Sequence, residues 1–215
     1  MNSIQHVLFD LDGTLTDPST GITRCLDYAL TAMGLPSPAL IDLEQYIGPP
    51  LDVAFTDLGI ASSEIPRAIS LYRDRFVSIG LFENEVYEGI PEMLERLRDT
   101  GLDLHVATSK PTQFAVRILE HFAIASFFEE VVGATLDGSR SHKTDVIAHT
   151  IRHTGPARSV MIGDRKHDVE GATAHGIPAV AVTWGFGSPE ELTAANPWHT
   201  ATSVEQLTEF LLTNR

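Results

Sequence analysis

The sequence predicts an α/β protein whose parallel-sheet core is interrupted by an all-helical insertion. Short apolar runs of strand length alternate with helical patterns along residues 91–212, which is typical of βαβ units and a parallel sheet. One further run of this kind, Val7–Phe9, stands near the start of the chain, and a single strand there needs the later strands as partners. Between these two parts, residues 18–82 contain helical patterns and no convincing strand.

The insertion is expected to contain four helices, each ended by a glycine or a Gly-Pro break. They are expected at residues 22–33, 40–47, 51–58 and 63–79. Polar, turn-rich links around residues 17–21 and 82–89 join this block to the rest. We therefore expect a Rossmann-like core of residues 1–17 and 83–215, with a separate helical domain of residues 18–82.

The core is expected to alternate strands with helices in one continuous order. The expected strands are 7–9, 102–107, 131–133, 159–162 and 179–182. The expected helices are 91–100, 111–122, 143–153, 168–175, 189–195 and 204–212, and Pro111 suits a first-turn position in the second of them.

Composition narrows the possible functions. The chain has 215 residues and a formal net charge of −14, which argues against binding to nucleic acid polymers and to anionic membranes. The start MNSIQHVLFD lacks the features of a signal peptide, and no apolar run is long enough to span a bilayer. Cys25 is the single cysteine, so an intrachain disulfide is impossible. These features predict a cytoplasmic protein.

Two carboxylates mark the end of the first predicted strand. Asp10 and Asp12 follow Val7–Phe9 directly, and Gly13 then turns the chain. In open α/β sheets, ligands bind beyond the carboxyl ends of the strands, and side chains two positions apart share a face. Asp and Gly are also common in plain turns, so this stretch alone does not distinguish a site from a turn.

Polar residues also follow two later strands. Thr108, Ser109 and Lys110 come after residues 102–107, and Gly163-Asp164 with Asp168 come after residues 159–162. Parallel geometry puts these strand ends on one edge of the sheet. Lys143 opens the helix that precedes the last of these strands. Neighbouring carboxylates suit a hard cation such as Mg²⁺, and hydroxyl and ammonium groups suit a phosphoryl group.

The order DLDGTL, TSK, a lone lysine and GDRKHD resembles the haloacid dehalogenase superfamily of aspartyl-phosphate phosphatases. The resemblance covers essentially the whole chain, and the insertion occupies the position of the superfamily's helical cap domain. Accessory stretches are similar to the phosphoglycolate phosphatase and 5′-nucleotidase-like branch. These stretches are residues 46–51, 80–84, 108–111 and 184–187.

The resemblance implies a role for each of the core residues. Asp10 would be the nucleophile that forms an aspartyl-phosphate. Asp12 would protonate the leaving alcohol and then deprotonate the attacking water. Thr108 would bind the phosphoryl oxygens, and Lys143 would hold Asp10 and the phosphoryl group in register.

The resemblance also implies a Mg²⁺ site. Asp10, the main-chain carbonyl of Asp12 and Asp164 would bind the ion, and Asp168 would be a further acid of the metal site or would orient its neighbours. Substrate binding is expected at the backbone amides near Gly13 and Ser109, and at Thr108 and Lys110. Two arginines extend this set, namely Arg24 in the cap and Arg165 at the mouth of the site.

The sequence therefore favours a Mg²⁺-dependent hydrolase of small phosphomonoesters, such as phosphoglycolate or a nucleoside 5′-monophosphate. The partner would be a small phosphorylated metabolite, and the protein a monomer or homodimer. A sugar phosphomutase of the same superfamily is one alternative. A receiver-like module whose aspartate is phosphorylated for signalling is another, although Asp12, the insertion and Lys143 disfavour it. A catalytically silent binding protein is disfavoured by the complete motif set.

Overall fold

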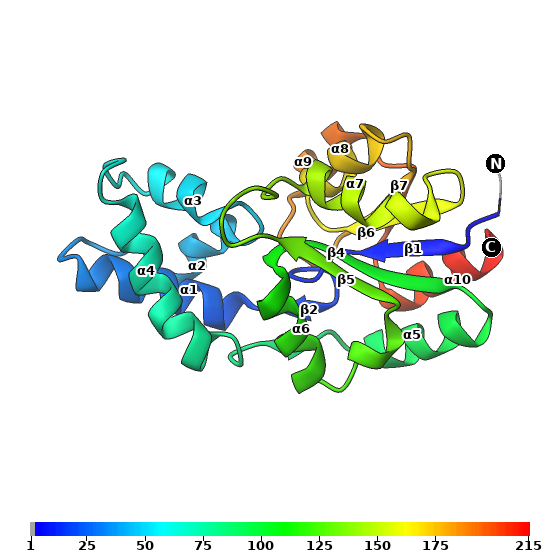
Figure 1. Ribbon diagram of the computed structural model, residues 1–215, viewed down its shortest axis with the longest axis horizontal. Coiled ribbons are helices and arrows are strands. Elements are labelled where there is room, and N and C mark those ends of the chain that lie inside the picture. The colour runs from blue at the N-terminus through cyan, green and yellow to red at the C-terminus, as the bar shows by residue number, and fades with distance from the viewer. Residues whose placement is uncertain (1–2) are drawn as a thin grey trace. The chain divides into compact units, whose positions relative to one another are not determined.

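The computed structural model describes residues 3–215, which form two compact units (Figure 1). One unit contains the described residues up to Thr16 together with Val86–Arg215, and the other is Asp17–Glu85. The chain passes between the units at β2 (Thr16–Asp17) and β3 (Glu85–Val86), which pair as a two-stranded sheet that the sequence did not predict. We call the first unit the α/β unit and the second the helical unit.

The α/β unit is built on one six-stranded sheet in the order β5-β4-β1-β6-β7-β8. All the strand pairs in this sheet are parallel, which confirms the predicted fold class. The strands are β1 (His6–Phe9), β4 (Asp103–Pro111), β5 (Glu130–Ala134), β6 (Ser159–Gly163), β7 (Ala179–Val182) and β8 (His199–Ala201). The sequence missed β8, because its three residues form no apolar run.

The register of the three central strands aligns the carboxyl ends of β1 and β6, while β4 continues to Pro111. Phe9 of β1 lies opposite Val106 of β4 and Ile162 of β6. The residues after β1 and β6 and the last residues of β4 thus lie at the same edge of the sheet. Asp10 continues this alignment, since its backbone N–H donates to the carbonyl of Ile162 at 2.9 Å.

Helices cover both faces of the sheet (Figure 1). One face carries α7 (Lys143–Thr154), α8 (Lys166–Thr173) and α9 (Pro189–Ala195), and the other carries α5 (Ile90–Asp99), α6 (Thr112–His121) and α10 (Val204–Thr213). A short 3₁₀ turn, Ala125–Phe127, precedes β5. Side chains of β1, β4 and β6 pack against α7 and α8 in a core that contains Leu8, Ala107, Met161, Ile147 and Val169. The central strands are therefore buried on both faces, as their continuous apolar runs predict.

Strand β4 is longer than predicted and includes the Thr108-Ser109-Lys110 segment. Its pairing with β5 shifts register between Ala107 and Pro111, which marks an irregularity in the ladder. The polar segment was expected to follow the strand, because polarity after an apolar run usually signals its end. Pro111 likewise precedes α6 rather than lying in its first turn.

The helical unit is all-helical between its two short flanking strands. It contains α1 (Ser19–Ala32), α2 (Leu40–Leu43), a 3₁₀ turn at Glu44–Tyr46, α3 (Leu51–Asp57), α4 (Ile65–Arg75) and a π turn at Phe76–Gly80. Helix α1 begins three residues before the predicted start. The single helices predicted at residues 40–47 and 63–79 each change their winding part of the way along.

Helix α1 packs closely on α4 and its π turn. Cys25, Leu26 and Ala29 of α1 are fully buried. A Cβ at Gly21 would collide with the backbone carbonyl of Gly80, so glycine at position 21 permits this approach.

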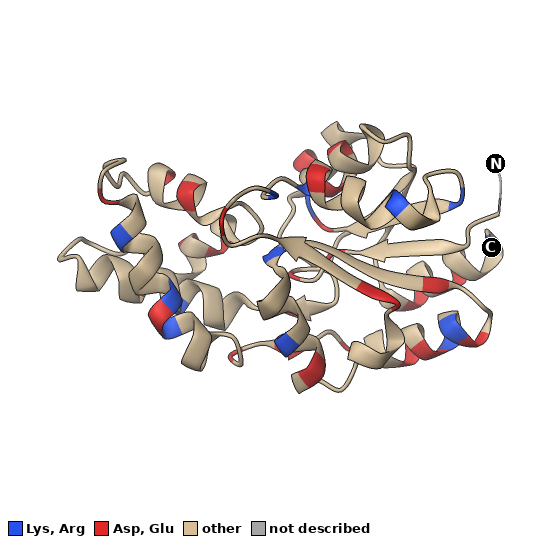
Figure 2. Cartoon of the chain, viewed as in Figure 1, with Lys and Arg blue, Asp and Glu red and all other residues tan. Residues whose placement is uncertain are grey.

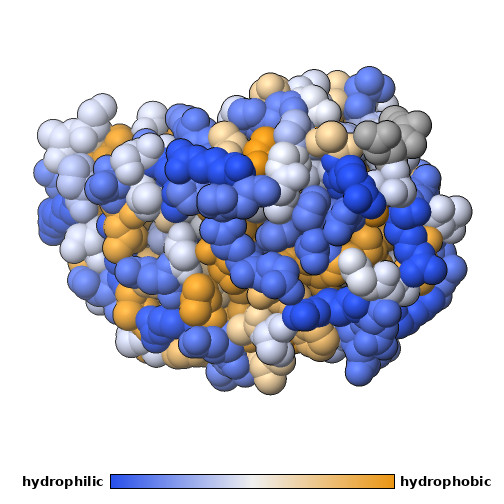
Figure 3. Space-filling view, turned by 45° about the vertical axis from the view of Figure 1, so that its right-hand side comes forward, coloured by the Kyte–Doolittle hydropathy of each residue, from blue (hydrophilic) through white to orange (hydrophobic). Residues whose placement is uncertain are grey.

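Acidic residues outnumber basic residues in the chain. Figure 2 shows acidic residues on helices of each unit, with fewer basic residues among them. On the face drawn in Figure 3, hydrophilic residues predominate and apolar ones lie between them. None of the described helices combines the length and the apolar character that a bilayer crossing requires.

Candidate active site

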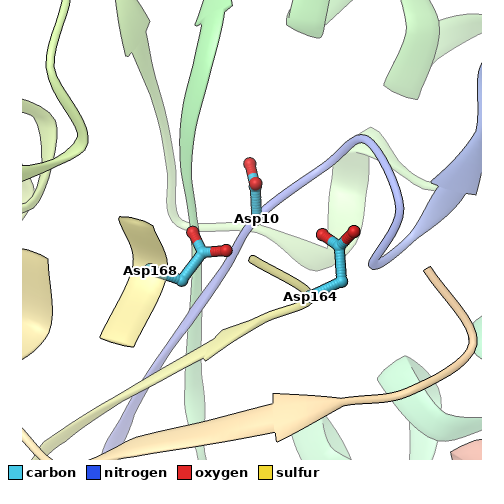
Figure 4. A group of neighbouring side chains, drawn as sticks. All are labelled: Asp10, Asp164 and Asp168. Carbon is cyan, nitrogen blue, oxygen red and sulfur yellow. The ribbon is translucent and has the colours of Figure 1, made fainter. Parts of the chain in front are cut away.

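Three buried carboxylates meet at the carboxyl edge of the sheet. Asp10 follows β1, Asp164 follows β6, and Asp168 lies in the first turn of α8. Figure 4 shows the three side chains converging from these separate segments. One oxygen from each carboxylate lies within 4.8 Å of the others, so the group could hold a metal ion.

Lys143 supplies the positive charge that faces two of these acids. Its ammonium lies 2.8 Å from Oδ1 of Asp10 and 2.8 Å from Oδ1 of Asp168. It also donates a hydrogen bond of 3.1 Å to the carbonyl of Ala107 in β4. As the first residue of α7, Lys143 is buried and ties this helix to the residue after β1 and to β4.

Burial and mutual repulsion govern the protonation of these groups. Burial raises the pKa of Asp164 well above its usual value, and the nearby charges of Asp168 and Asp10 raise it further. Burial also raises the pKa of Asp168 to about 6, although Lys143 opposes this shift. Burial lowers the pKa of Lys143, but Asp10 and Asp168 outweigh it, so the net shift is upward.

The donor set fits a divalent cation on chemical grounds. Three carboxylates face one ammonium, so full ionisation leaves uncompensated negative charge in a buried place. Carboxylate oxygens are the ligands that Mg²⁺ prefers. A bound divalent cation would offset the charge that raises the pKa of Asp164.

Asp164 is held by groups that sequence reasoning did not assign to the site. The hydroxyl of Thr14 donates to its Oδ1 at 3.2 Å, and the backbone N–H of Phe186 donates to its Oδ2 at 2.8 Å. Gly185 passes so close that a Cβ there would collide with the Asp164 side chain. The indole N–H of Trp184 donates to the carbonyl of Thr14 at 3.1 Å.

These contacts give a structural role to residues 184–187, which the sequence offered only as a branch resemblance. The loop wraps around the Asp164 side chain and supplies it with a backbone donor. The two glycines in Trp184-Gly-Phe-Gly187 are the signal that could have suggested a close backbone approach. Gly13 also permits a close approach of the backbone to Asp164. Its φ is +82°, and a Cβ there would collide with the Asp164 side chain.

Asp12 is paired with a different lysine. The ammonium of Lys110 lies 2.9 Å from Oδ2 of Asp12, and both side chains are largely buried. Among the residues that the structure describes, Oδ1 of Asp12 has no hydrogen-bond partner. Burial raises the pKa of Asp12, and the charge of Lys110 opposes that shift.

The Asp12 carboxylate thus stands apart from the group of three acids. Its side chain is not among those that could hold the metal, whereas its main-chain carbonyl remains the predicted ligand. Thr108 is buried in β4, and its Oγ1 accepts a hydrogen bond from the backbone N–H of Lys110 at 3.2 Å. Ser109 is partly buried between them.

The two arginines predicted for substrate binding already have carboxylate partners. Arg165 donates through Nε to Oε1 of Glu191 at 2.9 Å and through Nη2 to Oε2 at 3.2 Å. Arg24 belongs to the helical unit, where its Nη1 lies 2.8 Å from Oε1 of Glu83. Glu83 also binds Arg75 of α4 at 2.7 Å. Both substrate assignments stay predictions.

The fold and the acid group agree with a family match over residues 7–182. This range matches the model of the haloacid dehalogenase-like hydrolases, and the chain belongs to that family. The resemblance predicted from the motifs is thereby confirmed. The prediction of an enzyme is confirmed with it, as a hydrolase whose relatives include phosphatases.

Relatives of this chain are named for different activities. The chain is 45% identical over 209 residues to a 5′-nucleotidase of Pseudomonas aeruginosa, covering 96% of this chain and 95% of that protein. It is 41% identical to the tyrosine-protein kinase PtkA of Mycobacterium tuberculosis, covering 97% of this chain and 73% of the relative. A phosphoglycolate phosphatase of Vibrio parahaemolyticus is 28% identical, with 96% of this chain and 95% of that protein covered.

A solved structure supports the same family and fold. The crystal structure of a predicted phosphatase from Clostridium acetobutylicum superposes with a TM-score of 0.95 at 42% identity. The match covers 99% of this chain and all of the other.

Proposed function

We propose that this protein is a Mg²⁺-dependent phosphatase that hydrolyses small phosphomonoesters through an aspartyl-phosphate on Asp10. The observation that carries the proposal is that the two acids Asp10 and Asp12 lie in different environments. Asp10 lies against Lys143 and the other metal-site acids, whereas Asp12 keeps one carboxylate oxygen without a partner. A nucleophile and a proton carrier need these two different environments.

In the first step, Asp10 attacks the phosphorus of the ester. Lys143 and the backbone N–H of Leu11 both contact Oδ1 of Asp10, at 2.8 Å and 2.7 Å. We assign the attack to Oδ2, because the stabilising contacts on the other oxygen hold the carboxylate in place. The P–O bond to the alcohol breaks, and Asp12 gives its proton to the departing oxygen.

In the second step, Asp12 takes a proton from water, and the water oxygen attacks the phosphorus of the aspartyl-phosphate. The bond to Asp10 breaks, inorganic phosphate leaves, and both acids return to their starting state. The Thr108 hydroxyl binds a phosphoryl oxygen throughout, and Lys143 offsets the charge on Asp10 and on the transferring group.

Asp10, Asp164 and the main-chain carbonyl of Asp12 would hold Mg²⁺, with Asp168 as a further acid of the site. When bound, the ion supplies positive charge next to the phosphoryl oxygens. Thr14 and the Phe186 N–H orient Asp164 for this role, as hydrogen-bonding partners of metal ligands commonly do.

The substrate class follows from the relatives' names and from the chemistry of the site. Phosphoglycolate and nucleoside 5′-monophosphates are the leading candidates, since relatives at 28% and 45% identity are named for these activities. We propose that the helical unit acts as the cap that selects among them and that Arg24 contributes to binding. A cytoplasmic location and a monomer or homodimer complete the proposal.

Phosphate release measured across phosphoglycolate, nucleoside 5′-monophosphates and sugar phosphates tests this function. We expect turnover with Mg²⁺ on at least one of these esters and none after chelation. Asp10→Asn keeps the shape of the side chain and should abolish turnover, while Thr150→Val, a buried substitution within α7, should retain it. Hydrolysis by Asp10→Asn at the wild-type rate would refute the nucleophile.

A second candidate is transfer of the phosphoryl group to a hydroxyl acceptor other than water. A relative at 41% identity is named as a tyrosine-protein kinase, which supports phosphoryl transfer as a second candidate. The sugar phosphomutase that the sequence offers as an alternative would also transfer a phosphoryl group. Product analysis separates the two candidates. Phosphate released with oxygen from labelled water indicates hydrolysis, whereas a new phosphoester on a sugar or a tyrosine indicates transfer.

A further inference from the structure

We propose that Lys110 is a positioning residue that fixes the Asp12 carboxylate by binding its Oδ2, which leaves Oδ1 directed at the reacting groups. This inference rests on the proposed function and deepens it, because the family comparisons assign nothing to Lys110. It gives Lys110 a role different from the substrate contact that the sequence predicts.

The two side chains form a close and secluded pair. Lys110 lies in the irregular end of β4, and Asp12 lies in the turn after β1. The Lys110 ammonium is 2.9 Å from Oδ2 of Asp12, and the side chains are 6% and 11% exposed. A buried ion pair with this geometry holds both partners far more firmly than a surface pair does.

The backbone of Lys110 is also tied to the site. Its N–H donates to the hydroxyl oxygen of Thr108 at 3.2 Å. Thr108 is the residue expected to contact the phosphoryl group. The segment that presents the ammonium to Asp12 is therefore linked to the segment that receives the substrate.

The pair makes the two oxygens of Asp12 chemically different. Oδ2 lies 2.9 Å from the ammonium of Lys110, which has only donors to offer it. Oδ1 is buried and has no partner among the described residues. Oδ1 is therefore the oxygen left to face the departing alcohol or the incoming water.

Lys110 and Lys143 thus serve different acids. Lys143 contacts Asp10 and Asp168, whereas Lys110 contacts Asp12. Removing Lys110 should leave the nucleophile intact and impair proton transfer alone. A loss of proton transfer with an intact nucleophile differs from a general loss of structure, which would impair both.

The test compares two esters that differ in their need for a proton donor. An alkyl phosphate has a strongly basic leaving group and depends on general acid catalysis, whereas p-nitrophenyl phosphate has a weakly basic one and depends on it little. The measured quantity is the ratio of kcat/KM for the alkyl ester to kcat/KM for the aryl ester. It is determined for the wild type, Lys110→Met, Lys110→Arg and the exposed-lysine control Lys166→Met.

We expect Lys110→Met to lower this ratio by about tenfold or more, as a part of the roughly 10²–10⁴-fold that a positioned proton donor contributes. Lys110→Arg should restore most of the ratio, because it keeps a cation beside Oδ2, and Lys166→Met should leave it at the wild-type value. Equal losses on both esters in Lys110→Met would overturn the positioning role while leaving the phosphatase proposal intact. A wild type that hydrolyses neither ester would instead overturn the proposed function, and the positioning role with it.

A second variant keeps the test decisive if Lys110→Met is unstable, because that substitution leaves a buried carboxylate unpaired. Asp12→Asn removes both the proton donor and the charge. In the Asp12→Asn background, Lys110→Met should cause no further fall in the ratio, because the group that Lys110 positions is already absent. A further fall of about tenfold there would overturn the proposal.

Discussion

The ammonium of Lys143 lies 2.8 Å from Oδ1 of Asp10, although Lys143 opens α7 and Asp10 directly follows β1, far away in the sequence. Parallel pairing places the end of β1 beside Val106 in the middle of β4, and α7 packs on β4. Lys143 thereby reaches Asp10, Asp168 and the carbonyl of Ala107 at once. This ammonium is the link between the nucleophile and the acid group.

Replacing Lys143 by Met should reduce kcat/KM by about 10²–10³-fold, the usual loss when one preorganised donor to developing charge is removed. The alkyl and aryl esters should be affected alike, because Lys143 acts on Asp10 and the phosphoryl group and not on the proton carrier. Phosphate-release kinetics measure this loss. A decrease confined to the alkyl ester would contradict the assignment of Lys143.

Mg²⁺ should stabilise the folded protein, because the ion relieves repulsion among Asp10, Asp164 and Asp168. Binding at about 100 times the Kd stabilises a protein by about 2.7 kcal/mol, so thermal unfolding should show a clear rise in Tm. Asp164→Asn should lose this rise and should unfold at an equal or higher Tm without Mg²⁺, since burial of the charged carboxylate is then avoided. An equal Mg²⁺-dependent rise in both proteins would contradict the site.

Thr14→Val should weaken Mg²⁺ binding by about 10–100-fold, because it removes the hydroxyl that donates to Oδ1 of Asp164 at 3.2 Å. Titration calorimetry measures the change directly. Thr150→Val is the matched control, since that hydroxyl is also buried but donates to the carbonyl of Val146 within its own helix. Unchanged affinity in Thr14→Val would show that the Phe186 N–H suffices to orient Asp164.

His105 should make the protein less stable in mild acid. It lies in β4, where both of its ring nitrogens lack a hydrogen-bond partner among the described residues. Burial lowers the pKa of His105 below 6.5, and the charge of neighbouring His6 lowers it further, while Asp103, Glu130 and Glu129 oppose the shift. The folded protein thus disfavours the charged ring that the unfolded chain accepts.

The sign of the effect follows from this difference. Well above pH 6.5 the imidazole is neutral in both states, and no stability is lost. Below that pH the unfolded state binds the proton more readily, so the free energy of unfolding falls as the pH falls. His105→Leu should reduce the loss of Tm between neutral pH and about pH 5.5, whereas His153→Leu, on the exposed side of α7, should not. An unchanged pH dependence in His105→Leu would contradict this explanation.

The sequence by itself determined the alternation of strands and helices, the helical insertion and the position of the acids. Val7–Phe9 followed by Asp10 and Asp12 predicts a buried strand that delivers carboxylates to a sheet edge, because an apolar run of this length is stable only between other strands. Asp164 follows from the same reasoning, since it stands just after an apolar run, whereas Lys143 was singled out as the residue that opens the helix before that strand.

Only the tertiary structure decided how these groups are paired. No local pattern distinguishes Lys110 from Lys143, yet the register of β4 beside β1 brings the first to Asp12 and the packing of α7 brings the second to Asp10. Arg165 is a similar case, because its position beside Asp164 gives no sign that α9 supplies Glu191 as its partner. Periodicity reports which face of an element is buried, but the partner of a buried charge depends on elements that are distant in sequence and adjacent in space.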